Sequence, residues 1–282
     1  MENNYTIIDG KSIKKDILEE LKEEVSKMNE KPSFVVIQVG DNEASNVYIK
    51  QKRKMAEYVG YIYEHKRYDE SVTMEELLND IDKLNKNPKI NGILVQMPLP
   101  EHLDTNVIQN AVIPSKDIDG LSDMNAGRLF HGKEALYSCT PYGVMELLKR
   151  YNIPVMGKHA VVVGRSNLVG KPMCMMLINA GATVTVCHSK TVDLAKYTRE
   201  ADILIICVGK ANFITDDMVK SDSVVIDVGI TRSENGLCGD VDFQNVANKT
   251  KYITPVPGGV GPMTVGMLGM NVLLAYKMQK GE

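Results

Sequence analysis

The chain has 282 residues, of which 44% are hydrophobic and 24% are charged, and its formal net charge is -3. This composition is typical of a globular protein, and the length favours two domains over a single core. No basic block stands out from the acidic residues around it, so electrostatics gives no support for a nucleic-acid partner. The N-terminus lacks the pattern of a signal peptide, and no apolar run approaches the roughly 18 residues of a membrane span. We therefore expect no membrane partner.

The cysteines and histidines argue against a metal protein and against a secreted one. The five cysteines are widely spaced and contain no Cys-x-x-Cys pair; they are Cys139, Cys174, Cys187, Cys207 and Cys238. An odd number with this spacing favours buried free thiols over disulfides or a zinc site. The five histidines are scattered as well. We expect no protein-bound metal, a reducing compartment and a cytoplasmic location.

The first half of the chain alternates helical patterns with short apolar runs. Helices are predicted near Ser12–Met28, Ala44–Val59 and Met74–Lys86, and strands at Phe34–Val39 and Gly92–Gln96. Such alternation is typical of a parallel α/β architecture.

The second half shows the same alternation more clearly, after a helix near Pro141–Tyr151 that joins the halves. Four apolar runs have the length and spacing of strands in a doubly wound sheet: Ala160–Val163, Thr183–Cys187, Ile203–Val208 and Val224–Val228. A further run, Tyr252–Val256, leads into the Gly/Pro-rich segment Pro257–Pro262. The final segment, Met263–Met278, is apolar and helical in period. The fold class is therefore α/β with two domains.

A glycine-containing turn follows the strand Ala160–Val163 and precedes a helical pattern. Its sequence is Gly164-Arg165-Ser166-Asn167-Leu168-Val169-Gly170. The order strand, turn, helix brings backbone N–H groups and a helix N-terminus towards a dinucleotide pyrophosphate. The spacing is not the common G-x-G-x-x-G, so a plain tight turn between strand and helix is the alternative.

The next strand favours NADP over NAD. An NAD site usually carries Asp or Glu about 20 residues after the glycine turn, whereas here Cys187 is followed by His188-Ser189-Lys190. Arg165, Ser189 and Lys190 could bind a 2′-phosphate by charge-assisted hydrogen bonds. Solvated surface charges are the alternative for Arg165 and Lys190.

A lysine lies on the apolar face of the helix Ala44–Val59. At about 100° per residue, Tyr48, Lys52, Met55 and Val59 fall within roughly 60° of one another. The charged residues of the helix cluster on the other side; they are Lys50, Arg53, Lys54 and Glu57. Burial would lower the pKa of Lys52 towards useful acid–base values, unless the side chain reaches out to solvent at the edge of the stripe.

Two further segments of the first half place polar residues after strands or in turns. Gln96 ends a predicted strand just before Met97-Pro98-Leu99-Pro100, at the edge where ligands of open α/β sheets bind. Asp117 and Asp119 belong to Lys116-Asp117-Ile118-Asp119-Gly120, and the spacing alone is compatible with purely structural turn residues.

Five segments together resemble the signature segments of the bifunctional methylenetetrahydrofolate dehydrogenase/methenyltetrahydrofolate cyclohydrolase (FolD-like) family. They occur in the family's order along nearly the whole chain. The segments are Tyr48-x-x-x-Lys52, Gln96-Met97-Pro98-Leu99-Pro100, Lys116-Asp117-Ile118-Asp119-Gly120-Leu121, Gly164-Arg165-Ser166-x-x-Val169-Gly170-Lys171-Pro172 and Pro255-Val256-Pro257-Gly258-Gly259-Val260-Gly261-Pro262-Met263-Thr264.

The resemblance implies a folate-binding catalytic domain of residues 1–140 and 263–282, to which the C-terminal helix returns. It also implies a Rossmann-like NADP-binding domain of residues 141–262 that mediates a homodimer. The implied activity is oxidation of 5,10-methylenetetrahydrofolate with NADP and hydrolysis of the methenyl product to 10-formyltetrahydrofolate, as part of one-carbon metabolism that supplies purine biosynthesis.

The resemblance also implies roles for single residues. Lys52 is the acid–base group, oriented by Tyr48 and Gln96. The expected substrate-binding residues are Asp119, Tyr48, Gly259, Pro262 and Thr264. The expected cofactor-binding residues are Gly164, Arg165, Ser166, Val169, Gly170, Ser189 and Ile230. Two alternatives are less well supported. A two-domain NADP dehydrogenase of the shikimate type would not predict Tyr48-x-x-x-Lys52 together with the Pro257–Pro262 segment. A non-catalytic nucleotide-binding sensor would tolerate loss of Lys52 and Asp119, and both are present.

Overall fold

A computed structural model describes residues 4–233 and 236–281 of the chain. It divides into two compact units. The six-stranded unit contains the residues up to Lys14 together with Thr140–Thr264, and the three-stranded unit contains Lys15–Cys139 together with the residues from Val265 on.

The three-stranded unit is built on a parallel sheet in the order β3-β2-β4. Its strands are β2 (Ser33–Val39), β3 (Ile62–Tyr68) and β4 (Gly92–Val95). Its helices are the larger part of α1 (Gly10–Ser26), then α2 (Glu43–Val59), α3 (Met74–Lys86), α4 (Thr105–Ala111) and α5 (Asp123–Phe130). Every residue of β2 is buried, because this central strand is covered on both faces.

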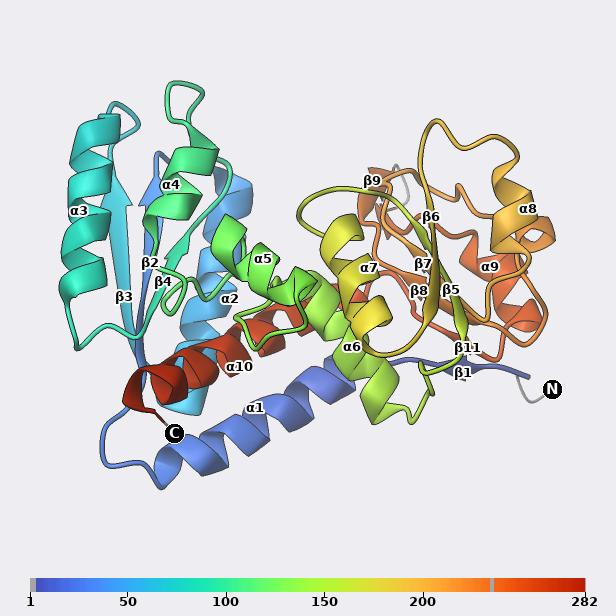
Figure 1. The fold of residues 1–282 in the computed structure, drawn as a ribbon, viewed down its shortest axis with the longest axis horizontal. Helices are drawn as coiled ribbons and strands as arrows, with labels where there is room; N and C mark the ends of the chain where they lie inside the picture. The colour runs from blue at the N-terminus through green and yellow to red at the C-terminus, as the bar shows by residue number, and fades with distance from the viewer. Residues whose placement is uncertain (1–3, 234–235, 282) are drawn as a thin grey trace. The chain divides into compact units, whose positions relative to one another are not determined.

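Alternation along the strands divides this core into two layers. Val35 and Ile37 of β2 pack with Leu77 and Ile81 of α3 and with Ile108 of α4. Figure 1 shows α3 and α4 beside the small sheet. The carboxyl ends of β2 and β4 are thereby held in fixed register, with Ile37 opposite Val95.

The six-stranded unit has a parallel sheet in the order β1-β11-β8-β7-β5-β6. Its strands are β1 (Thr6–Ile7), β5 (His159–Val163), β6 (Thr183–Cys187), β7 (Ile203–Ile206), β8 (Val224–Asp227) and β11 (Tyr252–Ile253). A short antiparallel pair, β9 (Thr231–Ser233) and β10 (Gly236–Cys238), lies outside this sheet.

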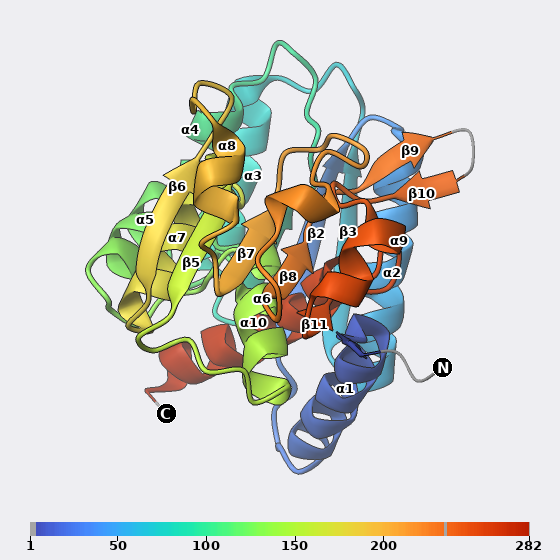
Figure 2. The ribbon, with the colours of Figure 1, turned by 90° about the vertical axis from the view of Figure 1, so that its right-hand side faces the viewer.

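Helices cover the six-stranded sheet (Figure 2). Leu194 of α8 and Val246 of α9 pack with Val161 and Leu204 of the central strands, while α7 packs on β5 and β6. The helices of the unit are α6 (Cys139–Arg150), α7 (Gly170–Asn179), α8 (Leu194–Thr198) and α9 (Phe243–Val246), with 3₁₀ turns at Asp216–Met218 and Ala247–Lys249.

The start of the chain packs on the six-stranded sheet, whereas the sequence analysis grouped it with the first half. Strand β1 pairs in parallel with β11, and the Tyr151 hydroxyl accepts a hydrogen bond of 2.8 Å from the Asp9 N–H. β1 was not predicted because a strand of two residues has no readable alternation.

The C-terminal helix α10 (Val260–Lys280) returns to the three-stranded unit, as predicted. The Tyr61 hydroxyl donates to the Gly269 carbonyl at 2.9 Å, and the Gln279 amide donates to the Asn91 carbonyl at 2.8 Å. The helix is apolar almost all round, which is the pattern of a buried helix.

Strand β3 was missed from the sequence. Its residues are Ile-Tyr-Glu-His-Lys-Arg-Tyr, and its side chains range from exposed to half-buried. An edge strand of this kind carries charged side chains and lacks a clean apolar alternation.

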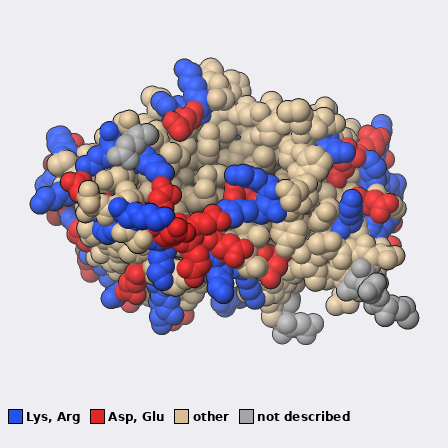
Figure 3. Space-filling model, turned by 90° about the horizontal axis from the view of Figure 1, so that it is seen from below, with Lys and Arg blue, Asp and Glu red and all other residues tan. Residues whose placement is uncertain are grey.

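The face of the molecule drawn in Figure 3 is not uniformly basic. In the view of Figure 3, acidic and basic side chains lie interspersed. Over residues 4–233 and 236–281, no helix is long and apolar enough to cross a membrane, and no cluster of three or more histidine, cysteine or acidic side chains could hold a metal. The five cysteines are free thiols.

Candidate active site

The centre of the site is a hydrogen bond between Lys52 of α2 and Gln96, the residue after β4. Lys52 Nζ donates to Gln96 Oε1 at 2.8 Å. Gln96 is held at the strand end because its N–H donates to the Ile37 carbonyl at 2.8 Å and its side-chain amide donates to the Met97 carbonyl at 2.7 Å. The helix and the strand end thus orient the lysine from two sides.

The surroundings of Lys52 change the pKa of its ammonium group. Burial lowers the pKa of the Lys52 ammonium below its ordinary value, while the nearby Asp119 carboxylate and the Cys139 thiol oppose that shift. Desolvation disfavours a charged amine, so this lysine can exchange a proton at less alkaline pH than a surface lysine.

Asp119 is the acidic partner in the same environment. Burial raises the pKa of its carboxyl group; the positive charge of Lys52 and a hydrogen bond from Cys139 oppose the rise, and the charge of Asp117 adds to it. The following residue, Gly120, has φ +67°, and a Cβ there would clash with the backbone at Tyr137. The close approach of these two segments therefore fixes the position of Asp119.

Asp117, only two residues earlier, has a different environment. Its buried carboxylate accepts hydrogen bonds from the Ser122 N–H at 2.8 Å and from the Asn125 amide at 3.0 Å. These bonds hold the start of α5, so Asp117 is a structural turn residue. The spacing of the two aspartates could not distinguish them.

The predicted stripe of α2 is buried at Met55 and Val59, which are each 2% exposed, and Lys52 is partly buried. Tyr48, one turn earlier, is 49% exposed. The buried face of α2 therefore becomes exposed at Tyr48, one turn before Lys52.

One residue beside the site, Asn271, was not predicted from the sequence. The fully buried Asn271 of α10 donates to the carbonyls of Ile118 at 2.9 Å and Tyr137 at 2.8 Å, and its amide nitrogen lies 3.7 Å from Cys139 Sγ. It thereby ties the Asp119 segment to the start of α6. The available signal was a lone asparagine within an otherwise apolar helix.

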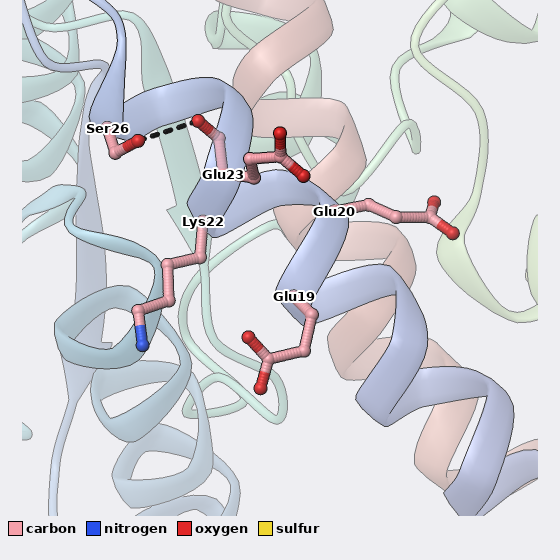
Figure 4. Close-up of a pocket in the computed structure, with 5 residues that line it drawn as sticks. All are labelled: Glu19, Glu20, Lys22, Glu23 and Ser26. Carbon is pink, nitrogen blue, oxygen red and sulfur yellow. Dashed lines mark hydrogen bonds between the residues drawn. The ribbon is translucent and has the colours of Figure 1, made fainter.

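The hollow along α1 is a poor candidate site. It is lined by Glu19, Glu20, Lys22, Glu23 and Ser26, all from one helix face. In Figure 4 these side chains point in different directions, and the dashed line marks Ser26 donating to the Glu23 carbonyl at 2.7 Å. Side chains that do not converge cannot bind a reacting group together.

In the six-stranded unit, the predicted glycine turn connects β5 to α7 at the carboxyl edge of the sheet. Gly164 has φ +134°, and a Cβ there would clash with the Cys207 thiol. A Cβ at Gly170 would clash with the Gly164 carbonyl. Ser166 Oγ accepts from the N–H groups of Val169 at 3.2 Å and Gly170 at 3.3 Å. Both glycines are required for this close backbone packing, so the turn has the compactness that a pyrophosphate-binding loop needs.

The turn after β6 lies next to the glycine turn. β5 and β6 are adjacent, and the Gly164 N–H donates to the Cys187 carbonyl at 2.8 Å. Ser189 and Arg165 are both exposed, in turns that follow these neighbouring strands. The structure thus brings the two predicted 2′-phosphate contacts to one edge of the sheet.

The Gly/Pro-rich segment before α10 packs against the start of α1. A Cβ at Gly10 would clash with the carbonyl of the buried Gly259, and the Lys11 N–H donates to the Gly258 carbonyl at 3.2 Å. Thr264 Oγ1 donates to the Gly261 carbonyl at 2.9 Å.

Pro262 and Ile230 are the remaining substrate- and cofactor-binding residues that were predicted in the six-stranded unit. Pro262 is half-buried in the first turn of α10, and Ile230 is 50% exposed. A Cβ at Gly261 would lie 3.3 Å from the Ile230 side chain. Ile230 therefore lies against the Gly/Pro-rich segment, a contact that the sequence spacing did not indicate.

Two family models match the chain. Residues 8–119 match the tetrahydrofolate dehydrogenase/cyclohydrolase catalytic domain, and residues 138–280 match the tetrahydrofolate dehydrogenase/cyclohydrolase NAD(P)-binding domain. The bifunctional protein FolD of Nautilia profundicola is 51% identical over 276 residues, which cover 96% of this chain and 97% of that protein.

Solved structures agree with the family models. The FolD methylenetetrahydrofolate dehydrogenase/cyclohydrolase of Campylobacter jejuni has a TM-score of 0.95 and 48% identity, covering 97% of this chain and 99% of that one. The Trypanosoma brucei enzyme, solved with NADP cofactor and an inhibitor, has a TM-score of 0.91 and 35% identity, covering 99% of each chain. The predicted family and the two-domain α/β fold class are confirmed. The chain belongs to the tetrahydrofolate dehydrogenase/cyclohydrolase family.

Proposed function

We propose that this chain oxidises 5,10-methylenetetrahydrofolate with NADP and hydrolyses the methenyl product to 10-formyltetrahydrofolate, with Lys52 as the acid–base group. The observation that carries the assignment of Lys52 is its 2.8 Å hydrogen bond to Gln96 beside the Asp119 carboxylate. A desolvated lysine with a pKa below its ordinary value is better suited to proton transfer than a surface lysine.

The two reactions make different demands on this lysine. In the oxidation a hydride leaves the methylene carbon and no proton has to move, so the protein mainly positions the folate. In the hydrolysis, water adds to the methenyl carbon, a proton is removed from that water, and a carbon–nitrogen bond opens after protonation of the leaving nitrogen. Lys52 can exchange these protons while Gln96 orients its amine. Tyr48, an exposed residue one helical turn before Lys52, is proposed to help orient the lysine and the substrate.

Asp119 is proposed to bind the pterin. A carboxylate accepts two parallel hydrogen bonds, which suits a ring N–H and an adjacent amino group. The loop residues Gly259 and Pro262, with Thr264, are proposed as further substrate contacts. The tight packing of Gly259 on Gly10 supports this role because it holds the loop backbone in one conformation.

The cofactor of this family enzyme is NADP, which accepts the hydride when bound. The turn at Gly164 and Gly170 fits a dinucleotide because its backbone packs too closely for any side chain at either position. We propose that the turn binds the pyrophosphate through the backbone N–H of Ser166, with Val169 in contact with the cofactor, and that Arg165 and Ser189 bind the 2′-phosphate. Ile230 is proposed to contact the cofactor through its exposed side chain.

A spectrophotometric assay tests the proposal directly. Purified protein is mixed with methylenetetrahydrofolate and NADP, then with NAD, and methenyl absorbance is followed; hydrolysis of added methenyltetrahydrofolate is measured separately. We expect oxidation with NADP and hydrolysis without any cofactor. A protein that binds NADP but does neither reaction would support the nucleotide-sensor alternative instead.

The functional division predicted from the sequence is kept as a proposal, with folate binding by residues 1–140 and 263–282 and NADP binding by residues 141–262. The first 14 residues then belong to the folate-binding domain in sequence but pack on the sheet of the NADP-binding unit. A cytoplasmic location is also proposed, because five free thiols fit a reducing compartment.

We propose a homodimer formed through the six-stranded unit. β6 is the end strand of its sheet, and apolar side chains near it are exposed: Val186 by 44%, Ile178 by 48% and Val192 by 85%. An uncovered strand edge with apolar neighbours favours association.

Light scattering after size exclusion should give twice the chain mass, and Val186→Lys should shift the protein to monomer. A monomeric wild type would contradict the proposal.

A further inference from the structure

Two buried aspartates lie behind the loops at the carboxyl edge of the six-stranded sheet. Asp227 ends β8 and is 3% exposed, and Asp240 follows β10 and is 0% exposed. No positive side chain is paired with either carboxylate in the described part of the chain; backbone N–H groups surround them instead. Neither residue was singled out by the sequence analysis.

Asp240 is held by three consecutive N–H groups of the turn after β7. Its carboxylate accepts from Val208 at 2.7 Å, Gly209 at 3.0 Å and Lys210 at 2.7 Å. Gly209 has φ +67°, the left-handed conformation that lets successive N–H groups converge on one point. Such a concavity of N–H groups binds anions in many proteins, and here the chain's own carboxylate occupies it.

Asp227 anchors Asp240 in turn. Its carboxylate accepts from the N–H groups of Gly229 at 3.0 Å, Asp240 at 3.0 Å and Val241 at 2.9 Å. Burial raises the pKa of the Asp227 carboxyl to about 7, although these N–H donors oppose the rise. A Cβ at Gly229 would clash with the Asp240 carboxylate, so the segment after β8 packs directly on this pair.

The turn that Asp240 holds is in contact with the glycine turn. Gly164 lies so close to Cys207 that a Cβ would clash with its thiol and lie 2.7 Å from its carbonyl oxygen. Cys207 directly precedes the three N–H groups that Asp240 accepts. Gly229 on the other side is followed by Ile230. The carboxylate pair therefore supports two of the proposed cofactor contacts, one on each side.

We propose that Asp240 is a positioning residue for NADP: its carboxylate fills the N–H concavity after β7, and so holds Cys207 against the Gly164–Gly170 turn. This inference rests on the proposed NADP-binding function of that turn. A carboxylate suits this position because it has two acceptor oxygens for the three N–H groups. A neutral amide has only one acceptor oxygen, and its NH₂ group would point at a backbone N–H.

The first test is Asp240→Asn in the full-length protein. The amide is nearly the same size, but its NH₂ group faces at least one backbone N–H, so the turn should shift. We expect the Kd for NADP, measured by titration calorimetry, to rise about 10- to 100-fold, the usual loss for a charged hydrogen bond. The KM for NADP should rise in parallel. Hydrolysis of added methenyltetrahydrofolate needs no NADP and should stay within about twofold of wild type.

Asp222→Asn is the matched control, because Asp222 is an exposed aspartate of the same unit. It should leave NADP affinity and both activities unchanged. A folded Asp240→Asn protein with wild-type NADP affinity would overturn the proposal while leaving the proposed function intact. If the wild type itself bound no NADP, the proposed function would fail instead.

A second pair of variants covers the case in which Asp240→Asn does not fold. No neighbour lies within 4 Å of a Cβ at Gly209, so a β-carbon there causes no clash and the left-handed backbone conformation is the main constraint. Gly209→Val disfavours the left-handed conformation and should weaken NADP binding, whereas Gly209→Asn tolerates it and should restore most of the affinity. Equal NADP affinity in both variants would overturn the proposal.

Discussion

Lys52 and Lys116 are both lysines whose pKa is lowered by burial, yet their surroundings differ in kind. Lys116 is 4% exposed and donates to the carbonyls of Leu84 at 3.1 Å, Asn85 at 2.8 Å and Asn87 at 2.7 Å, at the C-terminal end of α3. It closes a helix end, where a cation is stabilised by unpaired carbonyls.

Lys52 has the opposite arrangement. Its ammonium donates a hydrogen bond to the single amide oxygen of Gln96, and Asp119 contributes a negative charge beside it. The Lys116 ammonium donates all three of its protons to fixed carbonyls, so losing one proton would leave a carbonyl without its donor. The comparison teaches that burial alone does not identify a catalytic lysine; the number and type of its acceptors do.

The largest expected effect concerns Lys52. Lys52→Gln keeps some length and hydrogen bonding but cannot transfer a proton, so hydrolysis of methenyltetrahydrofolate should fall by about 10²- to 10⁴-fold. Oxidation should persist at a measurable fraction, and methenyl absorbance should accumulate during turnover. Normal hydrolysis would remove Lys52 from the mechanism and make it a lysine that merely reaches towards solvent.

Lys116→Met should reduce stability and leave activity intact, the reverse of the effect expected for Lys52→Gln. The three carbonyls at the end of α3 lose their donor, so the free energy of unfolding should fall by about 3 kcal/mol. Both activities per folded molecule should stay near wild type at a temperature below the transition. Urea unfolding gives the first quantity and the two spectrophotometric assays the second. A specific loss of hydrolysis without a loss of stability would break the contrast between the lysines.

Asp119 and Asp117 differ in the same way as the two lysines, one belonging to the proposed site and the other to the fold. Asp119→Ala should reduce both activities about 10- to 100-fold, because both use the same bound folate, while NADP affinity stays nearly intact. Asp117→Ala should instead lower the melting temperature, since the N–H of Ser122 and the amide of Asn125 lose their acceptor. Normal folate turnover by Asp119→Ala would return Asp119 to the role of a turn residue.

Arg165 is an exposed cation in the turn after β5. Arg165→Ala should weaken NADP binding by about 1.5–3 kcal/mol, or 10- to 100-fold, and barely change NAD binding. Calorimetric titrations with each nucleotide give the two values. Equal losses for both would place Arg165 at the pyrophosphate or in the fold.

The smallest effect is a shift in a pH profile. If the free amine of Lys52 removes the proton, hydrolysis should rise with pH through a pKa below the usual lysine value of about 10.4. The negative charge of Asp119 raises the pKa of Lys52, so Asp119→Asn should move the midpoint to lower pH. An unmoved midpoint would mean that another group is titrating.

The order of the elements and part of the site could be predicted from local patterns. The helix at α3 was predicted at Met74–Lys86 and the strand β6 at Thr183–Cys187, with the bounds that the structure has. The buried stripe of α2 was predicted because helical periodicity indicates which face is apolar. The roles assigned to Lys52 and Asp119 came from the resemblance of whole segments and stay predictions until they are measured.

The sequence by itself determined where the longer amphipathic helices and the apolar strands lie, which family the chain belongs to, and that Lys52 lies on an apolar face. Only the tertiary structure decided the partners: Gln96 lies 44 positions from Lys52, and Asn271 reaches a carbonyl 153 positions away at Ile118. It also decided that Asp117 and Asp240 accept backbone N–H groups. Periodicity indicates which face of a single helix or strand is buried. Hydrogen-bond partners depend instead on how elements far apart in the chain pack together, and no local sequence pattern contains that information.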